Sequence, residues 1–367
     1  MTTGHLVDVA APAEPREVDF DRVRRDVDAH LADFLDHKRR TAPDACLSAL
    51  VDLVRDFIAG GKRLRPLFCC CGWVAAGGEP DDPAVLWTAA ALELSHSFAL
   101  IHDDIMDASD LRRGRRTVHR SVADDCAEDC GCDRDAAERF GESTAILVGD
   151  LCFAWCDELL TRPRLPEERL RTVRKLVGTM RTELIAGQFL DIAPPSEEQP
   201  MSRAWRVVRL KTARYTVELP LQIGAALAGA DRRLLAACSA YGAPLGEAFQ
   251  LRDDLLGVFG DPAVTGKPDA DDLRAGKRTV LMALAWKEST PEQREVIRGL
   301  LGDPALTAAD AERLREVIRA TGARERVEQM IQARANRALA ALRTAPVTAA
   351  ARHALTDLVA LATRRAR

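Results

Sequence analysis

The chain is poor in aromatic residues and has no excess of basic residues. Phe, Trp and Tyr make up 5% of its 367 residues, and only two tyrosines occur. This composition disfavours a β-sandwich or barrel, because strands are enriched in aromatic and β-branched residues. With 52 Lys and Arg against 56 Asp and Glu, the formal net charge is −4. We expect no nucleic-acid partner, since domains that bind nucleic acid carry a basic excess.

Segments that would direct the chain into or across a membrane are not evident in the sequence. No uninterrupted apolar run reaches the roughly 18 residues that suggest a membrane span. The N-terminus lacks the basic start and apolar run of a secretory signal. Residues 1–18, which contain Pro, Ala and acidic side chains, are predicted to form a flexible leader. We expect a cytoplasmic protein without a membrane span.

Cysteine is present, but not in the paired spacing of a familiar metal site. The ten cysteines include no CxxC pair with a matching second half. Cys126, Cys130 and Cys132 lie in an acidic stretch that leaves a zinc or redox site open, although a surface loop with reduced thiols is favoured. The three consecutive cysteines at 69–71 lie in an apolar segment, where we expect small buried side chains.

Helical periodicity dominates the rest of the chain. Apolar residues recur every three or four positions, and no alternating strand pattern of useful length occurs. The pattern predicts helices over residues 19–38, 45–58, 66–76, 83–107, 141–160, 166–191, 202–228, 231–260, 277–287, 291–301, 307–320, 323–343 and 346–365. Residues 108–135 are polar, contain glycine and lie outside this pattern. We predict an all-α fold in which residues 19–367 form one large helical bundle.

Two clusters of aspartates interrupt these apolar helices. Asp103, Asp104 and Asp107 occur in HDDIMD, and Asp253 and Asp254 occur in QLRDDLLG. At about 3.6 residues per turn, the three carboxylates of the first cluster share one helix face, where they repel one another unless a cation lies among them. Exposed acids at a helix end would explain either cluster alone. Together, in apolar surroundings, they predict a site for Mg²⁺, which binds few carboxylates together with phosphate oxygens.

Basic residues lie before and between the two clusters. GGKRLRP places them after two glycines, which let the backbone turn closely around a ligand. A segment of this kind is by itself often only a helix start with a solvated face. His96 lies two turns before Asp103 on nearly the same face, which favours a phosphate contact over an ordinary core position. In GGKRLRP, Arg65 can fork onto phosphate oxygens and Lys62 is a compact charge. Further basic groups are Arg112, Arg113, Lys211, Lys267 and Lys277.

The order of these motifs resembles that of the trans-isoprenyl diphosphate synthases, also called polyprenyl synthetases. The motifs are GGKRLRP, DDIMD followed by RRG, GD at 149–150, KT at 211–212, FQLRDD and DLRAGKRT, between about residues 40 and 290. The resemblance implies an all-helical bundle around a deep central cavity, usually in a homodimer. It implies that isopentenyl diphosphate condenses with dimethylallyl, geranyl or farnesyl diphosphate and releases diphosphate.

The resemblance also implies how the metal would be bound. Asp103 and Asp107 would bind two Mg²⁺ ions with Asp104 in support, and Asp253, beside Asp254, would bind a third. The family's second motif is commonly DDxxD, whereas Gly257 takes the third position here. Because the first aspartate of that motif is the direct ligand, catalysis stays plausible. Asp261 could cover the same face only if the helix continued past Gly260, and Pro262 argues against this.

The remaining roles that the resemblance implies concern the two substrates. The allylic diphosphate would be bound by Arg112, Lys211 and Lys267. The diphosphate of isopentenyl diphosphate would be bound by Lys62, Arg65, His96 and Arg113. Thr212 and Gln250 would direct their dipoles at the developing allylic cation. A dry apolar cavity would protect that cation from water.

Product length is predicted from the helix that precedes Asp103. Phe98 and Ala99, five and four residues before it, would form the floor of the cavity. One aromatic beside one alanine, with no insertion in the aspartate motif, indicates a geranylgeranyl (C20) product as in bacterial synthases. Alternatively, Phe98 packs between helices and the floor lies elsewhere, for instance on a dimer partner.

Other functions with the same fold are open from the sequence. A farnesyl (C15) synthase or a synthase of longer polyprenyl chains would differ only in the floor. A terpene cyclase takes one allylic diphosphate, so GGKRLRP and Arg113 would have no substrate to bind. A non-catalytic subunit of a heteromeric prenyltransferase usually has lost aspartates or cations, whereas nearly all are present here.

Overall fold

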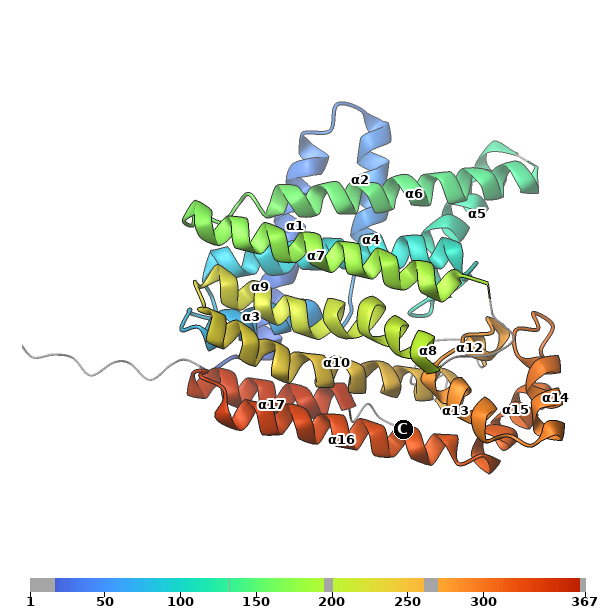
Figure 1. The fold of residues 1–367 in the computed structure, drawn as a ribbon. Helices are drawn as coiled ribbons and strands as arrows, with labels where there is room; N and C mark the ends of the chain where they lie inside the picture. Colours follow the sequence, from blue (N-terminus) through green and yellow to red (C-terminus); the bar gives the residue numbers. More distant parts are fainter. Residues whose placement is uncertain (1–16, 132, 195–200, 261–269, 364–367) are drawn as a thin grey trace, which may run out of the picture.

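Helices form almost everywhere that the apolar periodicity predicts them. The computed structural model describes residues 17–131, 133–194, 201–260 and 270–363. The helices that match the predicted ranges closely are α1 (Phe20–Arg40), α2 (Ala45–Ile58), α3 (Leu64–Ala75), α4 (Pro83–Met106), α7 (Glu167–Ile192), α10 (Arg232–Phe259), α13 (Val280–Glu288), α14 (Pro291–Leu300), α15 (Ala308–Ala320), α16 (Ala323–Thr344) and α17 (Ala349–Thr363). Helix α6 (Arg134–Leu159) begins seven residues before the predicted start at residue 141. The all-α prediction is confirmed (Figure 1). The leader predicted for residues 1–18 lies, up to residue 16, outside the described residues.

The polar stretch 108–135 is more ordered than its composition suggests. It contains a hairpin of two short strands, β1 (Leu111–Arg112) and β2 (Arg115–Arg116), followed by α5 (Val118–Cys130). The loop predicted around Cys126 is therefore wrong for that residue, which lies on α5. Val118 and Val122, one turn apart, are buried where α5 packs against α6, and the acidic residues that follow them hid this spacing. Cys132 lies outside the described residues.

The helix predicted over 202–228 is divided into three parts. It begins as α8 (Met201–Val207), continues as an eleven-residue π-helix, η1 (Val208–Glu218), and ends as α9 (Leu219–Leu227). A π-helical stretch is rare and is frequently found at functional sites. A further helix that the sequence did not predict is the single turn α12 (Asp271–Arg274).

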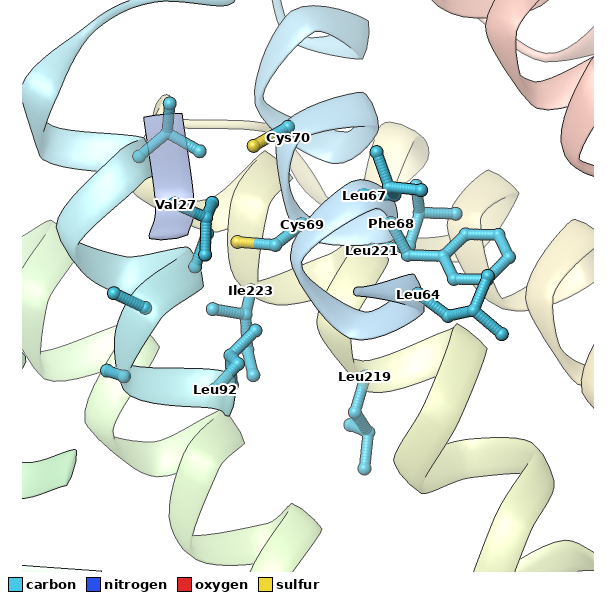
Figure 2. Close-up of a cluster of buried hydrophobic side chains, with 14 of the residues drawn as sticks. Val27, Leu64, Leu67, Phe68, Cys69, Cys70, Leu92, Leu219, Leu221 and Ile223 are labelled. Carbon is cyan, nitrogen blue, oxygen red and sulfur yellow. The ribbon is translucent and has the colours of Figure 1, made fainter. Parts of the chain in front are cut away.

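One hydrophobic core lies where α3, α4 and α9 meet. Helix α4 begins with Pro83 in its first turn after Asp82, whose carboxylate accepts a hydrogen bond from the backbone NH of Ala84. Helices α3 and α9 cross at Gly224, where a Cβ atom would lie 1.8 Å from the carbonyl oxygen of Cys69. Figure 2 shows the aliphatic and cysteine side chains that fill this crossing. The burial predicted for Cys69, Cys70 and Cys71 is confirmed.

A second hydrophobic core lies in the C-terminal part of the chain. Leu281 of α13, Leu314 of α15 and Val327 of α16 are fully buried there. Helix α10 connects the two cores, since its Leu245 belongs to the first and its Leu251 to the second. Figure 1 shows α10 running along the bundle towards the smaller helices α12 to α15. Asp253 and Asp254 therefore lie on α10, the helix whose position is fixed by packing in both cores.

Helix α4 is long and apolar enough to cross a membrane if only its length and composition are considered. It alone meets that criterion within the described part of the chain, and 67% of its most apolar window is buried inside the protein. It is a central helix of the bundle, packed against α6 and α3. Such a buried core helix is consistent with a soluble protein.

Candidate active site

The first aspartate cluster ends α4 and is held by cations from other elements. Asp103 accepts hydrogen bonds from the Nζ of Lys211 at 3.0 Å and from the side-chain amide of Gln188 at 2.8 Å. Burial acts to raise the pKa of Asp103, but the positive charges of Lys211, Lys277 and Arg112 outweigh it and hold the pKa below its ordinary value. Asp103 is therefore ionised at neutral pH.

Asp104, the next residue, binds Arg112 of the β1–β2 hairpin. Its carboxylate is only 1% exposed and accepts hydrogen bonds of 2.7 and 2.9 Å from the Nε of Arg112. A second guanidinium nitrogen of Arg112 lies 2.6 Å from Asp104 and 3.7 Å from Asp103. Burial raises the pKa of Asp104 even though Arg112 opposes the shift. Asp104 therefore positions an arginine beside Asp103, which suits a supporting role.

Lys211 lies on the π-helix and joins two helices. Its Nζ donates to Asp103 of α4 and, at 2.7 Å, to Asp191 of α7. The backbone comes close because α7 has Gly187 at the contact, where a Cβ atom would lie 2.5 Å from the backbone nitrogen of Lys211. On the other side, a Cβ atom at Gly246 of α10 would lie 2.5 Å from the Cα of Ala213. Two glycines therefore admit the wider π-helix between α7 and α10.

Lys277 connects the first aspartate cluster to an acidic residue of α12 (Asp271–Arg274). Its Nζ lies 3.4 Å from a carboxylate oxygen of Asp107 and 3.4 Å from one of Asp272, on α12. Burial by itself would lower the pKa of Lys277, but the surrounding aspartates raise it well above its ordinary value. The lysine therefore stays charged at neutral pH. Asp107 has a raised pKa, first because of burial and then because of the nearby charge of Asp103.

The second aspartate pair is the part of the site with the most strongly perturbed acid. Asp254 is 4% exposed and accepts one hydrogen bond, 2.7 Å long, from the side-chain amide of Gln250. Its other oxygen, Oδ2, has no hydrogen-bond partner. Burial, reinforced by Asp272 and Asp253, raises the pKa of Asp254 to about 8. A buried carboxyl with a free oxygen and a raised pKa is typical of a site that gains a cation with its ligand.

The donor set suits a divalent metal that arrives with phosphate oxygens. Within the described ranges, no three Asp, Glu, His or Cys side chains form a closed metal cage. Instead, lysines and Arg112 lie between the carboxylates. Mg²⁺ commonly takes only one or two protein carboxylates and completes its shell with water and phosphate. The free Oδ2 of Asp254 and the grouped aspartates of α4 therefore fit Mg²⁺ better than a metal that needs an all-protein cage.

A second basic region lies next to His96. The guanidinium of Arg65 stacks over the ring of Tyr215, 4.3 Å from its centroid, and donates a 2.7 Å hydrogen bond to the hydroxyl of Thr216. The Tyr215 hydroxyl lies 3.4 Å from Nδ1 of His96. Burial, followed by the charges of Arg65 and Arg113, lowers the pKa of His96 well below its usual range. The imidazole is therefore neutral at physiological pH, with Arg65 as the neighbouring cation.

Comparisons with known proteins agree with this geometry. The family model described as polyprenyl synthetase matches residues 48–320. The geranylfarnesyl diphosphate synthase of Aeropyrum pernix is 32% identical over 91% of this chain and 96% of its own length. The geranylgeranyl diphosphate synthase of Mycobacterium tuberculosis is 33% identical over 77% of this chain and 75% of its own length. The geranylgeranyl pyrophosphate synthase of Corynebacterium glutamicum, solved with isoprenyl diphosphate and magnesium, superposes with a TM-score of 0.90 at 42% identity, covering 95% of this chain and all (100%) of that one.

The chain belongs to the polyprenyl synthetase family. The resemblance stated from its motifs is thereby confirmed, and the protein is a trans-prenyltransferase. The family match spans both aspartate clusters and every basic motif between them.

In this prenyltransferase, the structure brings together most of the predicted site residues. Asp103 contacts Lys211 directly, and Asp107 contacts Lys277, whose charge also acts on Asp103. Thr212 follows Lys211 on η1 and is half-buried, and Asp253 is half-buried beside Asp254. Lys267 and Asp261 lie outside the described residues, so their predicted roles stay predictions.

The GGKRLRP motif of this synthase divides into structural and exposed residues. Arg63 is buried and pairs with Glu93 at 2.6 Å and with Asp28 at 2.7 Å, so it anchors the start of α3. Lys62 is exposed. Arg113 reaches back from the hairpin to Gly61, where a Cβ atom would lie 2.9 Å from its guanidinium nitrogen. This contact joins the motif to the first aspartate region and explains Gly61, while Gly60 is explained by its φ of 75°.

The predicted cavity floor of the synthase lies where α4 packs against α6. Phe98 is half-buried and meets Phe153 edge-on, with ring centroids 5.1 Å apart, and His102 at 4.9 Å. Ala99 beside it is also half-buried. These contacts suit both the floor and a packing role between helices, so the floor stays a prediction.

Several site residues of the synthase were not predicted from the sequence. Gln188 and Asp191 on α7 contact Asp103 and Lys211, and Asp272 contacts Lys277. A signal was available for the first two, because the polar pair in GQFLD lies three residues apart on one face of an otherwise apolar segment. Asp272 lies in the motif DLRAGKRT, but nothing local distinguishes it from the neighbouring Asp271.

Proposed function

We propose that this synthase condenses isopentenyl diphosphate with an allylic diphosphate to form geranylgeranyl diphosphate. The observation that carries the proposal is the chain of contacts from Asp103 through Lys211 to Asp191, and from Asp107 through Lys277 to Asp272. In these two chains of contacts, a lysine alternates with carboxylates, and the charges of Asp191 and Asp272 act on Asp254 of the second motif, which supports the proposal. The relatives named geranylgeranyl diphosphate synthase support the C20 product.

Divalent metal is a required part of this proposal. Asp103 and Asp107 would hold two Mg²⁺ ions, with Asp104 in support, and Asp253 would hold a third. The chemistry that Mg²⁺ supplies when bound is neutralisation of the diphosphate oxygens as the allylic carbon–oxygen bond breaks. In the absence of diphosphate, Lys211 and Lys277 neutralise the carboxylates themselves.

Binding of the allylic diphosphate would redirect these cations. Lys211 and Arg112, which now contact Asp103, can turn their hydrogen bonds to phosphate oxygens while the carboxylates turn to metal. Gln250, which now donates to Asp254, and Thr212 would present dipoles to the allylic cation. The apolar face of α4 would exclude water from that cation. The double bond of isopentenyl diphosphate then attacks, and the proton leaves with the departing diphosphate.

Isopentenyl diphosphate would bind in the second basic region. Arg65 can fork onto two phosphate oxygens, and Lys62 and Arg113 add positive charge from the two loops that meet at Gly61. Neutral His96 would donate a hydrogen bond and leave the net charge of this pocket to the arginines. A site for a second diphosphate favours chain elongation over terpene cyclisation, which needs only one.

The proposed assembly is a cytoplasmic homodimer. Large apolar side chains are exposed along one face of α6 and one face of α7; they are Phe140, Ile146, Leu147, Ile185, Phe189 and Ile192. Such surfaces are characteristic of protein interfaces. The described cysteines are all free thiols, which suits a reducing compartment.

The deciding experiment is incubation of the purified protein with Mg²⁺, dimethylallyl diphosphate and labelled isopentenyl diphosphate. We expect a labelled C20 diphosphate as the main product and no product in excess chelator. A C15 product or a product longer than C20 would correct the chain length alone. A hydrocarbon formed from the allylic substrate would identify a cyclase, and inactivity with every allylic substrate would indicate a non-catalytic subunit.

A further inference from the structure

Arg181 is a buried arginine that the proposed mechanism does not use. It lies on α7, two turns before Gln188, and is only 8% exposed. Its guanidinium lies over the ring of Phe153, with the central carbon 3.9 Å from the ring centroid. One terminal nitrogen pairs with Asp157 at 2.7 Å, and the other donates to the backbone oxygen of Phe153 at 3.3 Å. Both of these partners lie on α6, so Arg181 connects α7 to α6.

Phe153 is also the ring that meets Phe98 of the predicted cavity floor. The centroids of the two rings are 5.1 Å apart and their planes are inclined by 68°. Both rings are half-buried, whereas the guanidinium that stacks on Phe153 is almost completely shielded from water. Phe98, Phe153 and Arg181 therefore form a series of contacts from α4 through α6 to α7.

The level of Arg181 in the bundle is shown by its contact with Cys156 of α6. The thiol of Cys156 interacts with the side chain of Arg181 and with the backbone of Ser95. Burial raises the pKa of this thiol to about 11, although the charge of Arg181 opposes the shift. Ser95 precedes Ala99 by one turn of α4, so it lies about 6 Å further from Asp103 along the helix. The charged group is therefore one turn deeper than the predicted floor.

A buried guanidinium at this depth would oppose the entry of a hydrocarbon chain. Its charge is stabilised by the carboxylate of Asp157, the ring of Phe153 and a carbonyl oxygen. A prenyl chain that reached this level would separate the charge from some of these partners and would offer no hydrogen bond in return. Because a buried charge without partners is costly, the chain should stop before it.

We propose that Arg181 is a specificity-determining residue, a charged layer one turn deeper than Phe98 that limits the length of the product. This inference rests on the proposed function, since it assumes that the growing chain extends from Asp103 along α4. Removal of the Phe98 ring opens the upper part of the floor but leaves the charged layer in place. Product length then depends on a buried charge as well as on the size of residue 98.

The experiment compares the products that purified variants form from dimethylallyl diphosphate and labelled isopentenyl diphosphate with Mg²⁺. In Phe98→Ala, the chain should lengthen only as far as the charged layer. In Phe98→Ala/Arg181→Met, a flexible apolar side chain replaces the charge, so we expect the main product to be at least one five-carbon unit longer than that of Phe98→Ala. Phe98→Ala/Arg181→Lys keeps a positive charge and should give the products of Phe98→Ala.

The matched control removes another arginine from the same helix. Arg174 of α7 is exposed and pairs with Glu167, also exposed. Phe98→Ala/Arg174→Met should therefore give the products of Phe98→Ala. Melting temperatures establish that each variant is folded. If the methionine variant at position 181 does not fold, Arg181→Gln, which also removes the charge, takes its place with the same expected lengthening.

The proposal is overturned if a folded double variant without the charge forms products no longer than those of Phe98→Ala. It is also overturned if the lysine variant or the Arg174→Met control lengthens the product equally. Elongation by the wild type combined with either result refutes the role of Arg181 alone. If the wild type forms no elongated diphosphate, the proposed function fails and this proposal fails with it, so the two failures are distinguishable.

Discussion

The charges of the aspartates in this site are neutralised by lysines, and bound substrate and metal would replace these ion pairs. Lys211 contacts Asp103 and Asp191, and Lys277 contacts Asp107 and Asp272, so each lysine has two carboxylates. When one carboxylate turns to a metal ion, the other can keep the lysine in place. This redundancy allows ion pairs to exchange without leaving a buried charge alone, which would be costly.

Asp103 is the residue whose loss should be most damaging. In Asp103→Asn the shape is kept and the charge is lost, while Lys211 still has Asp191 and stays in position. Because a proposed metal ligand and a charge contact disappear together, we expect kcat to fall by on the order of 10²–10³ or more. Steady-state kinetics with Asp357→Asn, an exposed acid of α17, as control would test this. Activity of Asp103→Asn within tenfold of the wild type would mean that the metal site is wrongly placed.

His96 should make the protein less stable in acid. Its pKa in the folded state lies well below the ordinary value, chiefly because of burial. Between that pKa and about 6.5, the unfolded chain binds more protons than the folded one, so stability falls as pH falls below about 6.5. The limiting slope for one proton is about 1.4 kcal/mol per pH unit. The slope should be smaller in His96→Gln.

Urea unfolding at pH 7 and pH 5 measures this difference for the wild type and His96→Gln. The exposed His353 of α17 provides the control variant His353→Gln, which should follow the wild type. His119, whose pKa is also lowered by burial, contributes in the same direction and is unchanged in both variants. If all three proteins lost the same free energy of unfolding between pH 7 and pH 5, protonation of His96 would not destabilise the folded state.

At the scale of elements, the sequence predicted helices well and their mutual contacts poorly. The end of α4 at the aspartates and the apolar cores of α3 and α10 follow from local periodicity. The π-helix could not be predicted, because it needs Gly187 and Gly246 on two other helices to make room. The pairing of Lys277 with Asp107 likewise depends on tertiary structure, since the two residues are far apart in sequence.

Gly187 tests whether the close approach of α7 to the π-helix serves the site. In Gly187→Ala, the added methyl group would lie 2.5 Å from the backbone nitrogen of Lys211, so η1 and Lys211 must shift. We expect a loss of about 1–3 kcal/mol in the free energy of unfolding. We also expect kcat to fall by more than the fraction of protein that this loss would unfold.

The matched control is Gly178→Ala on the same helix, where nothing lies within 4 Å of the added atom. That variant should gain about 0.5–1 kcal/mol, because alanine is favoured over glycine inside a helix. Urea titrations and kinetics of the two variants are compared. If Gly187→Ala retains wild-type stability and kcat, the contact between α7 and η1 is not as tight as described.

The contact of α4 with α6 is where product length should be set. Removing the ring in Phe98→Ala takes away its edge-on contacts with Phe153 and His102 and opens the space before Asp103. We expect products of C25 or longer, identified by chromatography of the dephosphorylated chains. Ala99→Phe should have the opposite effect and shorten the product. An unchanged distribution in Phe98→Ala would mean that this ring only packs between helices.

At the scale of the whole molecule, the site lies between two hydrophobic cores that share one helix. Leu245 and Leu251 place successive parts of α10 in the first and second core, with the aspartate pair just beyond. Lys277 connects the C-terminal part to α4 of the N-terminal part. This sharing supports the prediction that residues 19–367 form a single domain, in which movement of either core would change the distance between the aspartate motifs.

The exposed apolar faces of α6 and α7 should form the interface of a dimer. On α7, Ile185, Phe189 and Ile192 follow helical spacing on a face adjacent to that of Gln188 and Asp191, so one helix would serve both the interface and the site. We expect a mass near twice 40.1 kDa for the wild type in analytical ultracentrifugation.

A charge in Phe189→Glu should convert the protein to monomer, with reduced activity because α7 loses support next to Lys211. Leu361→Glu, at an exposed apolar residue of α17, should stay dimeric. A wild-type monomer, or a dimer that survives Phe189→Glu and dissociates in Leu361→Glu, would place the interface elsewhere.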